Sequence, residues 1–275
     1  MGFTIQYISD IHLEMHDKDN EGYIIPSMFL KPSAPYLALC GDIGIPGLNA
    51  YEAFLSWCSK SWKHVFLIAG NHEFYNYRTP QKADIPTRIQ LIEQIVSKYP
   101  NVHFLNNSSY MLEADNLRIL GTTLWSDTSS GDERQMLLYM NDFRSIFLKD
   151  AENLHPYDVY DMYIKNREWL SKEIQDAKER GEEVLVLTHH LPTEKLIHEK
   201  YKSHPLNMCF ASNCEELIQV PVKGWICGHS HTGVRLELNG VKCVMNPYGY
   251  PGEKSETRNR EAVLSFGIKD EVLDI

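Results

Sequence analysis

Eight polar residues that can bind a metal ion or carry a proton follow short apolar segments of the chain. They are carboxylates, imidazoles and one amide, a mixture that suits divalent ions such as Mn²⁺, Fe²⁺ or Zn²⁺. Eight are too many for one ion that keeps a position open for water, because such an ion takes about three protein ligands. Two ions that share a bridging carboxylate would use the set economically. The residues are Asp10, His12, Asp42, Asn71, His72, His189, His229 and His231.

The apolar segments that precede these residues have the length and composition of buried strands. Amphipathic patterns typical of helices lie between them. This alternation predicts an α/β fold, and open α/β sheets bind ligands at the carboxyl ends of their strands. We therefore expect the polar residues to meet at one edge of the sheets. The expected strands are 3–9, 35–42, 64–72, 183–190 and 224–231, and the expected helices are 49–62, 86–99 and 157–179.

The rest of the chain predicts additional strands and three long loops. Residues 102–125 are typical of hairpins, and residues 234–248 and 262–274 of antiparallel strands, with a turn at Asn239-Gly240. No repeat or interdomain linker interrupts the pattern, so we expect one domain over residues 1–275. Long irregular loops in a compact domain are usually functional. We interpret loops 73–85, 126–156 and 191–212 as walls of the site.

Composition and charge narrow the class of protein. The chain has a net charge of −10, which argues against nucleic-acid binding because phosphate-backbone affinity comes from clustered Lys and Arg. Six cysteines occur, none in a CxxC pair, and we interpret them as reduced thiols of a cytoplasmic protein. The N-terminus lacks the features of a signal peptide, and no segment reaches transmembrane length. We expect neither a membrane nor nucleic acid as a partner.

The polar residues fall into five blocks: D-I-H at 10–12, G-D at 41–42, G-N-H-E at 70–73, His189, and G-H-S-H at 228–231. In this order they resemble the motifs of the calcineurin-like metallophosphoesterases. The resemblance implies a four-layer α/β/β/α sandwich of mixed β-sheets flanked by helices, with the metal site at the C-terminal ends of the strands. One departure is the sequence IGIPG after Asp42, where many members of that family have another acidic residue.

The resemblance also implies a role for each residue. Two divalent ions are expected, Mn²⁺ first, with Fe or Zn as alternatives. A hydroxide bridging the ions would be the nucleophile, and His72 would be the general acid near neutral pH. Glu73 is interpreted as a hydrogen-bond partner of neighbouring loops and Glu14 as a solvated side chain. The implied ligands are Asp10, His12 and His231 for the first ion, Asn71, His189 and His229 for the second, and Asp42 as the bridge.

Substrate contacts are predicted from residues that lie in or next to the long loops. Arg144 could clamp a phosphate with two parallel hydrogen bonds, or it could pair with Asp142. Asn141, His190 and Tyr250 are further candidates. The expected function is hydrolysis of a small phosphate ester, either a phosphomonoester or a small phosphodiester, with nucleic-acid ends disfavoured by charge. The alternative is a catalytically silent scaffold or binding module with the same fold. The sequence does not predict an oligomeric state.

Overall fold

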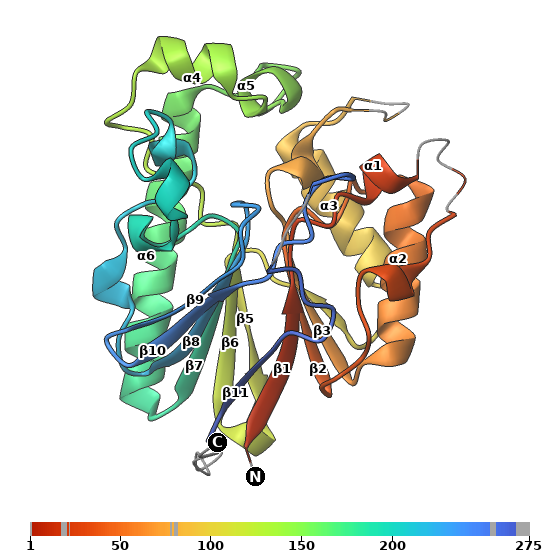
Figure 1. Ribbon diagram of the computed structural model, residues 1–275, viewed down its shortest axis with the longest axis vertical. Coiled ribbons are helices and arrows are strands. Elements are labelled where there is room, and N and C mark those ends of the chain that lie inside the picture. The colour runs from red at the N-terminus through yellow and green to blue at the C-terminus, as the bar shows by residue number, and fades with distance from the viewer. Residues whose placement is uncertain are drawn as a thin grey trace.

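The computed structural model describes residues 2–17, 21, 23–77, 79, 82–253 and 257–267. Two mixed β-sheets pack face to face, and helices cover the outer face of each sheet (Figure 1). This is the four-layer α/β/β/α sandwich that the sequence predicts. Within the described part of the chain, no helix combines the length and the apolarity that a membrane crossing requires.

The first sheet has five strands in the order β11-β1-β2-β3-β4. Neighbours from β1 to β4 run parallel, and β11 pairs with β1 in the antiparallel direction. Buried runs such as YLALC in β2 are typical of parallel strands that are covered on both faces. The strands are β1 (Phe3–Ile8), β2 (Tyr36–Cys40), β3 (His64–Ile68), β4 (Val102–Phe104) and β11 (Val263–Phe266).

The second sheet has six strands in the order β5-β6-β7-β8-β10-β9. The four central strands are parallel, and antiparallel strands β5 and β9 close its two edges. Asn239 and Gly240 adopt positive φ angles of 51° and 79° between β9 and β10, which confirms the predicted turn. The strands are β5 (Ser108–Leu112), β6 (Leu117–Thr122), β7 (Glu183–Thr188), β8 (Val222–Cys227), β9 (Val234–Leu238) and β10 (Val241–Met245).

Three long helices form the outer layers. In Figure 1, α2 (Asn49–Ser61) and α3 (Ile85–Val96) lie against the first sheet, and α6 (Pro156–Arg180) lies against the second. Local signals set their ends: the Asp84 side chain accepts a hydrogen bond from the Thr87 amide at the start of α3, and Gly181 ends α6 with φ 69°. The short helices are α1 (Leu13–His16), α4 (Glu133–Tyr139) and α5 (Asp142–Ser145).

The predicted hairpins in residues 102–125 are only partly correct. The β5 and β6 strands form an antiparallel pair, but β4 pairs in parallel with β3 in the first sheet. The chain therefore crosses from one sheet to the other between Phe104 and Ser108. The prediction assumed that neighbouring strands in the sequence pair with one another, whereas β4 extends the parallel edge of the first sheet.

Alternating side chains of the strands build two hydrophobic cores. In β2, Ala38 and Cys40 face the core between the sheets, whereas Leu37 and Leu39 face the core beneath the helices. One core therefore lies on each face of the first sheet. The strand ends that follow these cores are consequently held in fixed positions.

Candidate metal centre

The candidate ligands lie where strands of the two sheets end side by side. Asp10, Asp42 and Asn71 follow β1, β2 and β3 of the first sheet, and His189 follows β7 of the second. His229 and His231 follow β8. Both sheets therefore supply residues to the site, and each of these residues follows the C-terminal end of a strand, as predicted. These side chains are almost completely buried except that of His231, which is 20% exposed.

Sharp backbone turns aim several of these side chains. Asp10, His12, Asp42 and His229 all have left-handed backbone angles, with φ between 52° and 66°. Residues other than glycine seldom adopt this conformation, and it clusters at functional sites. The turn at His229 lets its amide donate to both oxygens of Asp10, at 3.0 and 3.1 Å, which joins the two sheets.

Two glycines of the motifs allow these turns to approach one another. A Cβ atom on Gly41 would lie 2.4 Å from Nδ1 of His189, and one on Gly70 would lie 2.2 Å from Oδ1 of Asp42. Both separations are far below van der Waals contact. The G-D and G-N pairs therefore require glycine before Asp42 and Asn71.

The first group of ligand atoms brings hydrogen-bond acceptors together. Nδ1 of His12 donates to Glu14 at 3.3 Å, and Nδ1 of His231 donates to Glu253 at 2.8 Å. The proton of each ring is therefore on Nδ1, and both Nε2 atoms carry lone pairs. These two Nε2 atoms lie 3.1 Å apart, and Oδ1 of Asp10 lies 3.7 Å from Nε2 of His231. A cation between them fits this set of donor atoms.

The second group has the same character. Nδ1 of His189 donates to the carbonyl oxygen of Cys40 at 2.9 Å, so Nε2 is the ring nitrogen that can bind a cation. That Nε2 lies 3.1 Å from Oδ1 of Asn71. Nε2 of His229 is buried without a hydrogen-bond partner among the described residues. A buried acceptor without a donor is costly, and a divalent cation would satisfy Nε2 of His229 together with Oδ1 of Asn71 and a deprotonated Nε2 of His189.

Asp42 touches both groups. Its Oδ2 atom lies 3.4 Å from Nε2 of His189 and 3.9 Å from Nε2 of His12. Burial opposes the charged form of His189, but the Asp42 carboxylate outweighs it and raises the pKa of His189 to about 10. Because a proton and a metal ion compete for the same Nε2 lone pair, binding of a cation there would release that proton.

The amide of Asn71 is held in one orientation. Its Nδ2 donates to Oδ1 of Asp142 at 2.8 Å, and the Tyr75 hydroxyl donates to the same oxygen at 2.5 Å. The amide oxygen must therefore face His189 and the second group. Asp142 thus orients a candidate ligand, whereas the sequence suggested it only as a partner of Arg144. Its position next to Asn141, in a loop predicted to overhang the site, was the available signal.

Glu73 fastens the backbone beneath the ligands. Its carboxylate accepts from the amides of Asp42, Ile43 and Gly70 at 2.7–2.9 Å. Burial, followed by the nearby charge of Asp42, raises the pKa of Glu73 to about 7. The prediction that Glu73 bonds to neighbouring loops is confirmed.

His72 lies beside the ligands with both ring nitrogens engaged. Nδ1 donates to Oε1 of Glu14 at 3.0 Å, and Nε2 lies 3.3 Å from the Tyr250 hydroxyl. Burial opposes protonation, but Asp42 and then Glu14 outweigh it and raise the pKa of His72 to about 9. The interpretation of Glu14 as a solvated side chain is wrong, because it is 1% exposed. Its Oε1 holds both His12 and His72.

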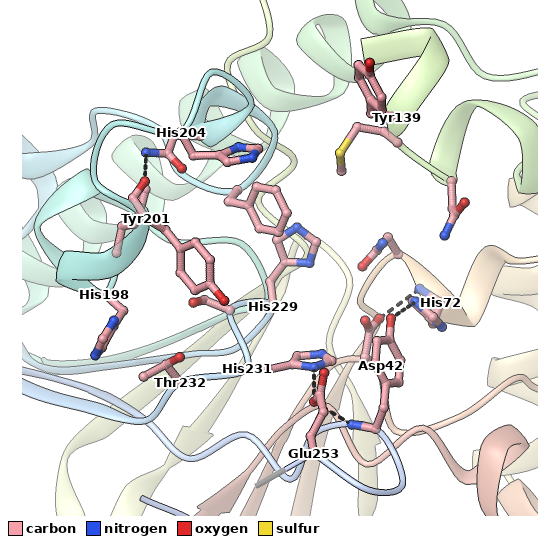
Figure 2. A pocket seen from close by; sticks show the side chains of 18 of the residues that line it. Asp42, His72, Tyr139, His198, Tyr201, His204, His229, His231, Thr232 and Glu253 are labelled. Atoms are coloured by element: carbon pink, nitrogen blue, oxygen red, sulfur yellow. Dashed lines mark hydrogen bonds and ion pairs between the residues drawn. The ribbon is translucent and has the colours of Figure 1, made fainter. Parts of the chain in front are cut away.

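A cavity of about 680 Å³ opens over the site. Its walls contain residues of all three predicted loops, including Tyr75, Tyr139 and Tyr201; residues 78, 80 and 81 of the first loop lie outside the described residues. Figure 2 shows Asp42 and His72 on one side and His229 and His231 nearer the centre. This volume is typical of sites for small organic ligands.

The predicted substrate residues are divided between this cavity and the protein interior. Asn141 and Tyr250 line the cavity. The Arg144 guanidinium is exposed and donates to the Leu138 carbonyl and Asn141 Oδ1. It does not pair with Asp142 among the described contacts. His190 is 1% exposed beneath His229, with ring centroids 4.3 Å apart. Substrate contact by any of the four stays a prediction.

Comparisons with known proteins agree with this architecture. A model of the calcineurin-like phosphoesterase family matches residues 3–233. An uncharacterized protein, L509, of Acanthamoeba polyphaga mimivirus is 28% identical over 262 residues, which cover 91% of this chain and 92% of that protein.

Two solved structures share the fold. The phosphopantetheinyl hydrolase of Mycobacterium tuberculosis superposes with a TM-score of 0.64 at 16% identity, covering 91% of this chain and 90% of that one. A dimetal phosphatase from Danio rerio gives a TM-score of 0.52 at 17% identity, covering 88% and 86% of the two chains.

Proposed function

Because the chain belongs to the calcineurin-like phosphoesterase family, we propose that it is a bimetallic hydrolase of small phosphoric esters. The observation that carries the proposal is that two groups of potential metal ligands lie within reach of one carboxylate oxygen, Oδ2 of Asp42. A phosphate ester entering the cavity would meet this edge of the sheets first.

Seven residues would hold two divalent cations. We propose to test two Mn²⁺ ions first. Such a pair supplies a water of lowered pKa and neutralises charge that develops on the phosphoryl oxygens. Asn71 contributes a neutral oxygen, which limits the negative charge that faces an anionic substrate. The proposed ligands are Asp10, His12 and His231 for one ion, Asn71, His189 and His229 for the other, and Asp42 for both.

His72 is the proposed general acid. Its Nε2 lies on the cavity side, close to the Tyr250 hydroxyl, while Nδ1 is bound to Glu14. A proton on Nε2 can therefore pass to the leaving oxygen of a bound ester, and Glu14 keeps the ring directed toward it. The hydrogen bond to the Glu14 carboxylate also favours the protonated ring that a general acid requires.

The cysteines support a location for the protein. All six are free and buried, which favours a reducing compartment. We propose the cytoplasm on that basis.

The first experiment removes the metal. Chelation should abolish hydrolysis of 4-nitrophenyl phosphate or bis(4-nitrophenyl) phosphate, and Mn²⁺ should restore it. The two substrates separate a monoesterase from a diesterase, and added Fe²⁺ and Zn²⁺ compare the other candidate ions. Full activity in a sample shown to contain no metal contradicts the proposal. Bound metal without hydrolysis of any ester would favour the scaffold alternative.

The second experiment separates the two neighbours in the G-N-H-E block. His72→Ala should retain both ions but lower kcat by about 10²–10⁴-fold for alkyl esters, the usual contribution of a positioned acid. Nitrophenyl esters should suffer less, because nitrophenolate leaves without a proton. Asn71→Ala is the matched control, since it should lower metal content and slow both ester types alike. An equal defect of His72→Ala across the series excludes His72 as the acid.

A further inference from the structure

One side of the cavity carries hydrogen-bond donors that the proposed reaction does not use. His198, Lys200 and His204 line the cavity, and we call these three residues the donor wall. They lie around a single 3₁₀ turn, Glu199–Tyr201. Figure 2 shows His198, Tyr201 and His204 across the cavity from Asp42 and His72. The donor wall is thus separate from the candidate ligands.

Backbone contacts fix the tautomer of both imidazoles in the donor wall. Nδ1 of His198 accepts from the amide of Lys200 at 3.2 Å. Nδ1 of His204 accepts in the same way from the amide of Leu206 at 3.3 Å. An imidazole whose Nδ1 accepts a hydrogen bond carries its proton on Nε2. Each ring therefore presents an N–H donor on the side away from its own backbone.

The third donor is an ammonium group without a carboxylate partner. Lys200 forms no ion pair with any residue in the described part of the chain, and its Nζ lies 5.2 Å from the centre of the Tyr201 ring. The adjacent acid, Glu199, instead pairs with Lys202. In a chain with net charge −10, the donor wall is a local site for an anion.

The backbone of the donor wall is held in place from below. The buried Asn207 side chain donates to the carbonyl oxygens of Tyr201 and Lys202 at 2.8 and 3.1 Å. The amide of His204 also donates to the Tyr201 carbonyl at 2.9 Å. The backbone that carries the three donors is therefore fixed before a ligand arrives, which removes part of the entropy cost of binding.

We propose that the donor wall binds a second phosphoryl group, so that the substrate is an ester with one phosphate at the metal ions and another on its organic part. This inference rests on the proposed function. An ammonium and two imidazole N–H groups match a tetrahedral anion with three acceptor oxygens. The rings of Tyr201, in the turn of the donor wall, and Phe210, 4.6 Å from the His229 ring, also line the cavity. They provide a surface for a flat ring such as a nucleobase.

The test compares AMP with adenosine 3′,5′-bisphosphate, which differ by one phosphoryl group. Each is used as a competitor of 4-nitrophenyl phosphate hydrolysis by the Mn²⁺-loaded enzyme, and the ratio of the two inhibition constants is measured. We expect the bisphosphate to bind about 10- to 100-fold more tightly, the range of a hydrogen bond between charged groups. Lys200→Ala should collapse this ratio. Lys202→Ala, which removes a neighbouring ion-paired lysine of the same charge, should preserve it.

Three results would overturn the inference. They are a ratio near one in the natural protein, a ratio that Lys200→Ala leaves intact, and an equal collapse in both variants. The last would mean that overall charge rather than the donor wall is responsible. Calorimetry of bisphosphate binding with EDTA present reports on the donor wall without turnover. Absence of hydrolysis of every ester tested would therefore refute the proposed function, and loss of bisphosphate binding in Lys200→Ala, measured by calorimetry, would still decide this inference.

Discussion

Replacing Glu14 tests whether one buried carboxylate positions both a metal ligand and the general acid. Glu14→Ala removes Oε1, which accepts from Nδ1 of His72 at 3.0 Å and from Nδ1 of His12 at 3.3 Å. The cavity that remains is small and polar, so we expect the fold to persist. Both rings would lose the partner that fixes their orientation.

The magnitude follows from the hydrogen bonds that are lost. A hydrogen bond to a charged group contributes about 1.5–3 kcal/mol, and 1.4 kcal/mol is about a factor of ten. If the bond to His72 sets the fraction of correctly oriented rings, kcat for an alkyl phosphate should fall about 10- to 150-fold. Loss of the bond to His12 should weaken binding of the first ion about 10–100-fold.

The assay measures kcat for alkyl and nitrophenyl esters over a range of Mn²⁺ concentrations. Excess Mn²⁺ corrects the defect that arises through His12, and the remaining defect belongs to His72. Glu14→Gln keeps an acceptor oxygen, so it should lie between Glu14→Ala and the natural protein. In a double-mutant cycle, Glu14→Ala should cost little kcat once His72 is already alanine. A full additional loss in that background, or an unchanged kcat in Glu14→Ala itself, refutes the reasoning.

Three further predictions concern the metal and the pH dependence of stability. Asp42→Ala should lose both ions where His12→Ala loses one, as measured by elemental analysis; equal metal content contradicts the bridging role. Asp142→Ala should weaken binding of one ion about 10–100-fold, because Asn71 loses the acceptor that orients its amide; unchanged affinity by metal titration refutes this. Burial, followed by a neighbouring imidazole, lowers the pKa of His103 from 6.5 to about 4. Between about pH 6.5 and 4, His103 is therefore protonated in the unfolded chain but not in the folded chain. The free energy of unfolding falls as the pH drops through this range. The Tm of His103→Gln should decrease less steeply over that range than that of the natural protein, and parallel curves would contradict the assignment.

The residues that sequence reasoning brought together were those at strand ends. Asp10, Asp42 and Asn71 follow the C-terminal ends of three neighbouring parallel strands. Strand direction alone therefore places them at one edge of the sheet. The same reasoning predicted that His189 and His229 follow strands, although it did not assign those strands to a separate sheet. What the pattern could not supply was the face-to-face arrangement of the sheets, which entered through the family resemblance.

The residues that sequence reasoning misjudged act through contacts between distant segments. Glu14 meets His72 across 58 positions, and Asp142 meets Asn71 across 71. No periodicity encodes such contacts, and a charged residue in a loop is ordinarily solvated. The same limitation affected β4, because its partner β3 is distant in the sequence while β5 is adjacent. For Arg144 the prediction named a nearby acid, Asp142, but its hydrogen bonds go instead to two other nearby residues, Leu138 and Asn141.

The left-handed backbone at Asp10, His12, Asp42 and His229 has a consequence for how the protein can evolve. Each such residue costs about 1 kcal/mol or more relative to relaxed backbone, and glycine would relieve much of that cost while deleting the ligand. A variant library selected only for survival of heating should therefore gather glycine codons at these four positions. A library selected for turnover should reject them there and accept stabilising changes elsewhere. At these four positions, selection for thermal stability and selection for catalytic activity therefore act in opposite directions.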